Sequence, residues 1–501
     1  MAADTTPLQS LHAPRKLKRR LGLFDSSMIV SGVMIGSGIF IVPAEMARTI
    51  QSPGWFLVAW VLCGILTISA AISFGELSSM LPGSGGMYLY LSQAYSPLWG
   101  FLYGWTFFTV IQTGSIAAVA VAFSRFAGVL FPWISESHYL LHPVLIGNHY
   151  AISLSTAQLL ALLVILILTS CNSLGVEYGK WIQNLFTIAK IAALLGIILL
   201  GFTASYNHAI LKANLSMAFQ PHGATFSNQL PAVSTWIGVL VAICVAQSGS
   251  LFAADSWHNI TFAAEEVKDP RRVLPRALGF GSVLVILLYL GANFAYLTSL
   301  NFHEIQTAPR DLVATAMLEK IFPSFGAPIM AVLIMISTFG CINSLVLSGA
   351  RAYFAMARDG LFFPAAARLN RADVPGVSLA LQAAWAGLLV LVTTYSPQGG
   401  FGNLYSDLLE YIISAALMFY ILTIAAVPIL RQTKPDAKRP YRTPMYPLTP
   451  VIYISGASAV VLCLFIFRPT TTWPGLFIVV FGIPVYFLFR RSRARKQFRH
   501  D

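Results

Sequence analysis

Charged side chains are scarce in this sequence. Only 10% of the 501 residues are Asp, Glu, Lys or Arg, whereas a soluble domain usually has about a quarter of its residues charged. Hydrophobic residues account for 56%. This composition excludes an ordinary soluble globular protein, and the polar stretches that do occur are too short to form a separate soluble domain.

Patterns of metal-binding or catalytic residues are equally sparse. The five cysteines lie in or at the ends of apolar runs: Cys63, Cys171, Cys244, Cys341 and Cys463. Their spacing suggests neither zinc ligands nor a disulfide framework. His258 is the one histidine of nine that falls within an apolar run, and no HExxH pattern occurs. We therefore expect no metal, no cofactor and no membrane-embedded enzyme, which would need a nucleophile with its base or a metal cluster at membrane depth.

Long apolar runs are what the sequence has instead. Runs near or above the roughly 20 residues needed to cross a hydrocarbon core recur from Met28 to Tyr486. We count twelve, at residues 24–51, 54–80, 97–131, 150–171, 178–202, 233–263, 274–300, 325–358, 376–395, 402–431, 448–467 and 473–490. The sequence therefore predicts an all-α polytopic membrane protein with twelve transmembrane helices.

Basic residues are distributed unevenly between the segments that join these runs. With the N-terminus inside, most of the 32 Lys and Arg residues fall in cytosolic segments. Apart from Arg125 near an outer helix end, the outer ends and loops hold only Arg48, Lys212, Arg310, Lys320 and Arg468. This asymmetry follows the positive-inside rule and predicts two cytosolic tails, at residues 1–23 and 491–501. We assign the net charge of +13 to topology in a cell membrane and to contact with anionic membrane lipid, not to nucleic acid.

Two of the predicted helices are interrupted near their middles by small or polar residues. The first contains Gly36-Ser37-Gly38, and the sixth contains Ser248-Gly249-Ser250 followed by Asp255-Ser256. These helices open two five-helix blocks, at residues 24–202 and 233–431, which an outer loop at 203–232 joins; residues 432–490 hold two further helices. Because five spans invert the second block, we expect inverted repeats, in which paired broken helices mark a transporter's binding site.

The first interruption has two interpretations, because glycines in membrane helices also serve close helix packing. A true break is favoured, since Gly36, Ser37 and Gly38 weaken the helix while Pro43 removes an amide donor. A break frees amides at the start of the outer half-helix, where the helix dipole also favours a carboxylate. The sixth helix would offer freed carbonyls to an ammonium. Together these groups predict a receptor for an α-amino acid.

The same stretches resemble a known family. Ile35-Gly36-Ser37-Gly38-Ile39-Phe40, Gly85-Gly86-Met87-Tyr88 and Glu265-Glu266 with Pro270 are among the segments that carry the resemblance. Their order and spacing are similar to the amino acid-polyamine-organocation superfamily, above all to the L-type amino acid transporter branch of solute carrier family 7. The resemblance covers nearly the whole chain. It implies the five-plus-five inverted-repeat fold of the bacterial leucine transporter, with helices 1 and 6 broken, and transport by alternating access.

The resemblance also implies roles for residues of the two interruptions. The substrate carboxylate would bind the amides of Ser37, Gly38 and Ile39. The substrate ammonium would bind the carbonyls of Ile35, Phe252 and Ala253. Phe252 would also be similar to the family's aromatic gate, and Gly36 would lie in the same pocket.

One feature of that branch is missing. Members that pair with a glycoprotein heavy chain have a cysteine in the outer loop between the third and fourth helices. Here that loop, residues 131–150, has no cysteine. We therefore expect a bacterial-type single subunit with no disulfide-linked heavy chain.

Lys190 lies about nine residues into the fifth helix, roughly 13 Å from its inner end at 1.5 Å per residue. A lysine at this depth either snorkels or faces a cavity or partner, and its stem is too short to reach either surface easily. In relatives the matching lysine stands where sodium-coupled members hold a sodium ion. Its ammonium would bind carbonyls near Gly36 and polar groups such as Ser337 or Asn343. The resemblance therefore implies sodium-independent transport.

Asp255 lies within the second interruption and also has two interpretations. In the first interpretation, the Asp255 carboxylate caps the outgoing half-helix by accepting a hydrogen bond from a free backbone amide. Alternatively, as relatives that accept basic amino acids imply, it is a counter-charge for a cationic side chain. His258, one turn later, and Glu410 on the tenth helix are further candidates for the pocket.

Acidic residues also gather at the predicted cytosolic ends of two helices. Glu76 ends the second helix, and Glu265 and Glu266 lie in the charged loop after the sixth. A solvated run of charge is the simpler interpretation. The alternative is an inner gate that opens and closes during alternating access.

The sequence thus favours a secondary active transporter of L-amino acids, neutral ones first and basic ones next, working by exchange or by proton coupling. A polyamine or other organic-cation carrier is the alternative, since it would use Asp255 and Glu410 and need no site for a carboxylate. A channel is disfavoured, because paired broken helices favour a discrete binding site over a continuous pore.

Overall fold

The computed structural model describes residues 17, 19–146, 150–220, 235–396, 400–401 and 404–497. Within this part, ten helical segments are long and apolar enough to cross a membrane. The bent pair α1 (Leu23–Met34) and α2 (Gly38–Ile50) makes an eleventh span when taken as one. The remaining expected span coincides with α15 (Gly376–Leu391), an apolar helix of 16 residues. The helical membrane fold is confirmed, while a twelfth full crossing stays a prediction.

The other helices follow in chain order. The spanning segments are α3 (Pro53–Met80), α5 (Pro97–Thr106) continued by η2 (Phe107–Ile111) and α6 (Gln112–Leu130), α7 (Thr156–Ser173), α8 (Val176–Phe202), α10 (Trp236–Ala253) with η3 (Trp257–Glu266), α11 (Pro270–Ser299), α14 (Gly326–Arg358), α16 (Leu404–Thr433), α17 (Leu448–Phe467) and α18 (Pro469–Gln497). The short connecting helices are α4 (Met87–Ala94), α9 (His208–Ser216), α12 (Phe302–Gln306), η4 (Pro309–Asp311), α13 (Val313–Ile321) and η5 (Pro364–Ala367).

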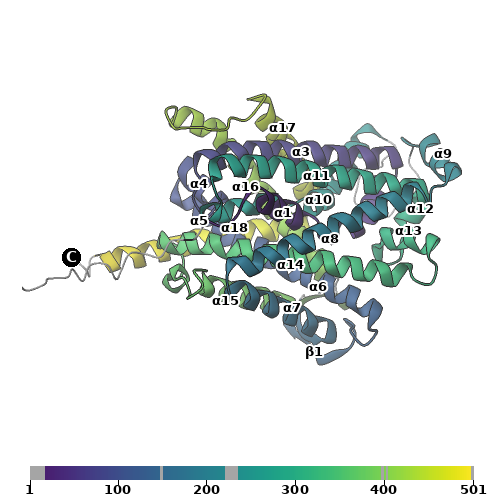
Figure 1. The fold of residues 1–501 in the computed structure, drawn as a ribbon, viewed down its shortest axis with the longest axis horizontal. Helices are drawn as coiled ribbons and strands as arrows, with labels where there is room; N and C mark the ends of the chain where they lie inside the picture. The colour runs from purple at the N-terminus through teal and green to yellow at the C-terminus, as the bar shows by residue number, and fades with distance from the viewer. Residues whose placement is uncertain are drawn as a thin grey trace, which may run out of the picture.

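The helices form one bundle with two distinct ends (Figure 1). We call the end at which α1 begins and α18 ends the basic end; it lies to the left in Figure 1. The opposite end carries α9, α12 and α13 together with the strands, and we call it the sheet end. The central position of α1, which packs against α8, α11 and α14, places its C-terminal break deep within the protein.

A small sheet at the sheet end was not anticipated from the sequence. Its strands are β1 (Tyr139–Ile146), β2 (Tyr150–Ser155), β3 (Val392–Ser396) and β4 (Gly400–Phe401), paired antiparallel in that order. The prediction that spans four and nine include residues 150–155 and 392–395 was therefore wrong. Residues 150–155 alternate between exposed and buried side chains, as a strand requires. Helix α7 begins only at Thr156, after its N-cap Ser155, whose hydroxyl accepts a 3.2 Å hydrogen bond from the Gln158 amide.

Several predicted boundaries fall at the edge of the described part. Residues 1–16 and 18 of the expected N-terminal tail, residues 221–232 of the outer loop and residues 498–501 of the C-terminal tail lie outside the described residues. The C-terminal tail was expected to begin at 491, but α18 continues to Gln497. The rest of the outer loop contains α9, whose N-cap Asn207 accepts hydrogen bonds from the amides of Ala209 and Ile210.

Candidate functional site

The first spanning segment is broken at the predicted place. Helix α1 ends at Met34 and α2 begins at Gly38, with a bend of 41° between them. The backbone of Ile35 is no longer helical, with φ −78° and ψ 86°. As the first residues of α2, Gly38 and Ile39 have amides without intrahelical acceptors, and neither amide has a recorded acceptor elsewhere in the described chain. The break thus presents amide donors at the positive end of a half-helix.

The sixth segment is interrupted opposite this point. Helix α10 ends at Ala253, Ser256 takes a left-handed φ of 66°, and the chain continues as the 3-10 helix η3. An added Cβ on Gly38 would lie 2.8 Å from both Cα and Cβ of Ala253, so only glycine fits here without a shift. At Gly36 an added Cβ would meet only Cys341 Sγ, at 3.5 Å. The two interruptions are therefore in direct contact at Gly38 and Ala253.

Tyr289 on α11 joins the two interruptions. Its buried hydroxyl lies 2.8 Å from the Met34 carbonyl and 3.0 Å from the Ala253 carbonyl. Trp60 packs edge-on against its ring, with centroids 5.9 Å apart. Sequence reasoning missed Tyr289, because a tyrosine in an apolar helix gives no sign that its hydroxyl reaches two residues far away in the chain.

Lys190 on α8 holds the carbonyl side of the first break. Its side chain is 1% exposed, and Nζ donates to the carbonyls of Gly32 at 2.5 Å and Ile35 at 2.9 Å. The Ser337 hydroxyl on α14 donates to the carbonyls of Ile35 and Gly36, at 3.0 and 3.1 Å. Lys190 is therefore not a snorkelling residue. The Ile35 carbonyl already accepts two hydrogen bonds, which fills the two lone pairs of a carbonyl oxygen.

Asn343, the other expected partner of Lys190, lies elsewhere. Its amide nitrogen donates to the Gly179 carbonyl at 3.1 Å, and its oxygen accepts from Asn172 at 2.8 Å. It thus joins α14 to α7 and α8, towards the basic end. The physical reason is distance along the helix, because Asn343 is six residues beyond Ser337, or roughly 9 Å.

Asp255 is held by α16. The hydroxyl of Tyr420 donates to Asp255 Oδ1 at 2.5 Å, and the Ser256 hydroxyl lies 3.3 Å from Oδ2. Tyr420 also lies 3.3 Å from His258 Nδ1, while His258 Nε2 is buried without a partner in the described chain. The hydroxyl contact with Tyr420 was not expected from the sequence. Glu410, on the same helix as Tyr420, has a side chain outside the described part.

Phe252 is partly exposed, unlike its neighbours in the chain. With Ile41 of α2 it packs against Ala118 and Ala122 of α6. Helices α2 and α10, which flank the two interruptions, therefore both contact α6 at small side chains.

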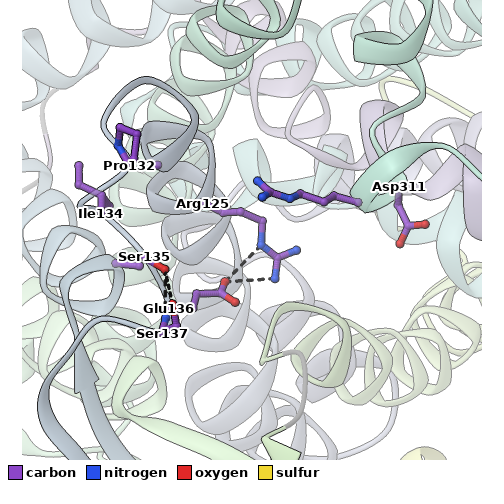
Figure 2. Close-up of a pocket in the computed structure, with 10 residues that line it drawn as sticks. Arg125, Pro132, Ile134, Ser135, Glu136, Ser137 and Asp311 are labelled. Carbon is purple, nitrogen blue, oxygen red and sulfur yellow. Dashed lines mark hydrogen bonds and ion pairs between the residues drawn. The ribbon is translucent and has the colours of Figure 1, made fainter.

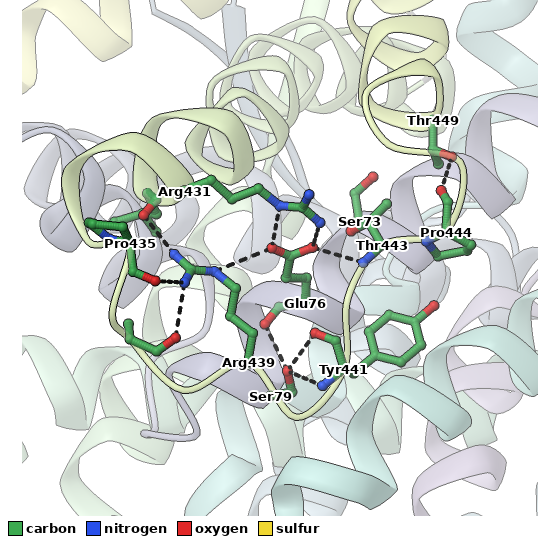
Figure 3. A network of polar contacts seen from close by, with 12 residues as sticks. Ser73, Glu76, Ser79, Arg431, Pro435, Arg439, Tyr441, Thr443, Pro444 and Thr449 are labelled. Atoms are coloured by element: carbon green, nitrogen blue, oxygen red, sulfur yellow. Dashed lines mark hydrogen bonds and ion pairs between the residues drawn. The ribbon is translucent and has the colours of Figure 1, made fainter.

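The basic end is closed by ion pairs that are mostly buried (Figure 3). Glu76 on α3 is 2% exposed and accepts hydrogen bonds from Arg431 Nε at 2.8 Å, Arg431 Nη2 at 2.6 Å and the Thr443 amide at 2.8 Å. Arg439 Nε lies 3.5 Å from the same carboxylate. The α16–α17 connection is thereby fastened to the end of α3.

A second ion pair lies at the end of η3. Arg351 and Glu266 are 1% and 0% exposed, and Arg351 Nε lies 3.0 Å from Glu266 Oε1. The Glu266 carbonyl also accepts from the Leu21 amide at 3.0 Å, just before α1. Glu265, in contrast, pairs with Arg358 on the surface at 3.3 Å. The interpretation of these acids as a solvated run of charge is therefore wrong for Glu76 and Glu266, and of the three it holds only for Glu265.

Among the described residues, no group of three or more His, Cys, Asp or Glu side chains could hold a metal ion. The groups that the two interruptions offer to a ligand are backbone amides and carbonyls, not charged side chains. Amide donors at the start of α2 lie beside carbonyl acceptors at the end of α10, and charged side chains are fixed to the surrounding protein. Such an arrangement suits a small zwitterion.

Comparison with known proteins gives a consistent picture. Residues 21–489 match the family model described as amino acid permease. The chain is 29% identical over 482 residues to the serine/threonine exchanger SteT of Bacillus subtilis, covering 95% of this chain and 98% of that protein. It is 31% identical over 472 residues to the large neutral amino acids transporter small subunit 2 of Mus musculus, covering 94% and 81%. It is 29% identical over 477 residues to the b(0,+)-type amino acid transporter 1 of the same organism, covering 94% and 88%.

Proposed function

The chain belongs to the amino acid permease family, and we propose that the two interruptions, residues 35–37 and 254–256, form the site that binds the amino acids it transports. Amino acid transport by exchange agrees with the names of its relatives, which are a serine/threonine exchanger and transporters of large neutral and b(0,+)-type amino acids. The family is one of transporters, so a membrane-embedded enzyme is excluded.

The observation that carries the site assignment is the contact of Gly38 with Ala253. It puts the first amides of α2 next to the last carbonyls of α10. The carboxylate of the substrate binds the amides of Ser37, Gly38 and Ile39. Its ammonium binds the carbonyls of Phe252 and Ala253. The Ala253 carbonyl accepts one side-chain hydrogen bond, from Tyr289, whereas the Ile35 carbonyl already accepts two, from Lys190 and Ser337.

Transport is independent of sodium in this proposal. Lys190 places a positive charge against the carbonyls of α1 at Gly32 and Ile35. A sodium ion at the same carbonyls would meet that charge at contact distance inside the protein, where repulsion is little screened.

Neutral amino acids are the preferred substrates. Both Asp255 oxygens have hydroxyl neighbours, Tyr420 and Ser256, so the carboxylate is engaged without a cationic ligand. A basic substrate would have to displace at least one of these contacts. The same contact argues against a polyamine or other organic-cation carrier, which would depend on Asp255.

The remaining features of the proposal concern architecture and partners. The five-helix blocks at 24–202 and 233–431 are inverted repeats that alternate in access around the site. The chain lies in the cell membrane with the basic end and both termini in the cytosol, as the distribution of Lys and Arg supports. It works without a disulfide-linked heavy chain, since residues 131–150 contain no cysteine.

Countertransport in proteoliposomes tests the substrate class. Vesicles are loaded with unlabelled serine, alanine, leucine, arginine or putrescine, and uptake of labelled alanine is measured. We expect serine, alanine or leucine inside to drive uptake, and putrescine to drive none. Uptake driven best by putrescine, or by none of the amino acids, would reject the proposal.

A further inference from the structure

A cavity of about 590 Å³ lies at the sheet end (Figure 2). Its walls come from distant parts of the chain. The end of α6, the turn that follows it and the start of α7 form one wall, and η4 forms the other with Arg310 and Asp311. The volume is in the range of sites for small ligands. Because one wall precedes α7 and the other follows α11, the cavity lies between the two five-helix blocks.

Three of the four charged side chains of the cavity are paired. Arg125 lies 3.1 Å from Glu136 Oε1, and Arg48 on α2 lies 2.6 Å from Asp311 Oδ1. The recorded hydrogen bonds of Glu136 use Oε1 alone, and the ion pair of Asp311 uses Oδ1. Arg310 is exposed and has no ion pair or hydrogen bond within the described chain. The cavity therefore presents one uncompensated guanidinium next to carboxylate oxygens.

The backbone at this point is unusual. Arg310 and Asp311 take consecutive left-handed conformations, with φ of 53° and 64°. Non-glycine residues adopt this region at a cost of order 1 kcal/mol each, and such strain gathers at ligand sites. The strain is maintained by the Asp311 bond to Arg48, whose Nη1 also donates to the Gln306 carbonyl at 2.9 Å.

The cavity is connected to the proposed substrate site by α2. Arg48, which holds η4, is ten residues beyond Gly38, so the cavity lies roughly 15 Å from the break along the helix axis. On the opposite wall, Arg125 of α6 is one to two turns beyond Ala118 and Ala122, the residues that contact Phe252. Both α2 and α6 thus lead from the cavity to the residues around the two interruptions.

We propose that this cavity is a second, low-affinity binding site, in which an α-amino acid docks on its way to or from the interrupted helices. The Arg310 guanidinium binds the carboxylate, and the unshared oxygens of Asp311 and Glu136 receive the ammonium. Guanidinium and carboxylate form paired hydrogen bonds, which gives the site its chemical preference. The inference rests on the proposed amino acid transport and adds the place where the substrate is first held.

Arg310→Asn tests the proposal, because asparagine tolerates the left-handed backbone and lacks the charge. The external concentration of labelled alanine or serine that gives half-maximal uptake (the half-saturation concentration) is measured in proteoliposomes of uniform orientation, with the sheet end outward, at low and high ionic strength. We expect Arg310→Asn to raise the half-saturation concentration at the sheet end by at least about threefold at low salt, with little change in the maximal rate of uptake. High salt should shrink the difference, and Arg310→Lys should restore most of the loss.

Lys212→Asn is the matched control. Lys212 on α9 is another exposed cation at the sheet end, and it does not line the cavity. The Lys212→Asn variant should leave the half-saturation concentration unchanged. Arg310→Asn should also leave it unchanged when the substrate is offered from the basic end. An unchanged half-saturation in Arg310→Asn, an equal effect of Lys212→Asn, or an equal effect at both ends would overturn the proposal. Failure of the unmodified protein to carry either amino acid would instead reject the proposed transport.

Discussion

Tyr420 donates a 2.5 Å hydrogen bond to Asp255, joining α16 to the interruption in the sixth segment across 165 residues of sequence. Asp255 is 6% exposed and Tyr420 is 3% exposed. A buried acid with a hydroxyl donor of its own is neither a free counter-charge nor a simple helix cap. The N-cap residue of η3 is Ser256, and it makes no side-chain capping bond.

Asp255→Asn separates charge from shape. The amide oxygen can still accept from Tyr420, but the negative charge is lost. If Asp255 attracts basic side chains, arginine should compete with labelled alanine about tenfold less well, since charge-assisted hydrogen bonds contribute about 1.5–3 kcal/mol. Alanine uptake itself should be retained. Arginine that fails to compete even with the unmodified protein would show that Asp255 plays no such role. Tyr420→Phe is the companion variant, and it should improve competition by arginine because it releases the carboxylate.

Gly38→Ala should impair transport more than Gly36→Ala. The new methyl group at position 38 lies within 2.8 Å of Ala253, whereas at position 36 it meets only Cys341 Sγ at 3.5 Å. Overpacking of this kind costs about 1–3 kcal/mol. Thermal unfolding in detergent and alanine uptake both report it. Ala253→Gly should partly rescue Gly38→Ala, and equal loss in the two glycine variants would contradict the close contact.

Replacing sodium by choline should leave uptake unchanged. Lys190 supplies the positive charge at the Gly32 and Ile35 carbonyls, so no cation from solution is needed there. Initial rates of alanine uptake at matched ionic strength measure the effect. A strict requirement for sodium would reverse our assignment of Lys190.

Lys190→Met should abolish transport and destabilise the protein. The Gly32 carbonyl would lose its hydrogen bond from Nζ, and an unsatisfied buried acceptor costs about 1–3 kcal/mol. Lys180→Met on the same helix is the control, because Lys180 is partly exposed and pairs with Asp25 and Glu177 at 3.8 and 3.5 Å. Comparable losses in both variants would contradict a specific role for Lys190 at the Gly32 and Ile35 carbonyls.

Glu76→Gln should loosen the basic end. It leaves Arg431 and Arg439 without their carboxylate, and breaking a buried pair from one side costs about 3–5 kcal/mol. Because Arg431 is 24% exposed, we expect the lower part of that range. Glu177→Gln breaks the exposed pair with Arg20 and should cost about 0–1 kcal/mol. Melting temperatures of the two variants in detergent should differ clearly, and equal values would argue against a buried lock.

Much of the site was accessible from the sequence because its signals are local. Glycines beside a proline predict the first break, and a lysine at membrane depth must have a partner, which proved to be carbonyls of α1 with Ser337 beside them. Tyr289 and Tyr420 were not accessible, since a tyrosine in an apolar helix looks the same whether or not its hydroxyl bridges distant segments. Buried charge at Glu76 could not be told from solvated charge, because its partner Arg431 is 355 residues away.

The strands illustrate a different limit. Apolar residues at the end of a span predict more helix, and residues 150–155 differ from a helical turn only in their alternation. The pairing that turns them into a strand comes from β3, more than two hundred residues later. Register across such a separation cannot be found from one sequence.

The same pairing constrains how the molecule moves. Residues 150–152 are matched to residues 394–392, so the start of α7 and the end of α15 are joined by a continuous backbone ladder at the sheet end. Each helix belongs to a different one of the two proposed five-helix blocks. In the proposed alternation of access, a displacement that separates α7 from α15 would have to break this pairing, so we expect the two helices to move together.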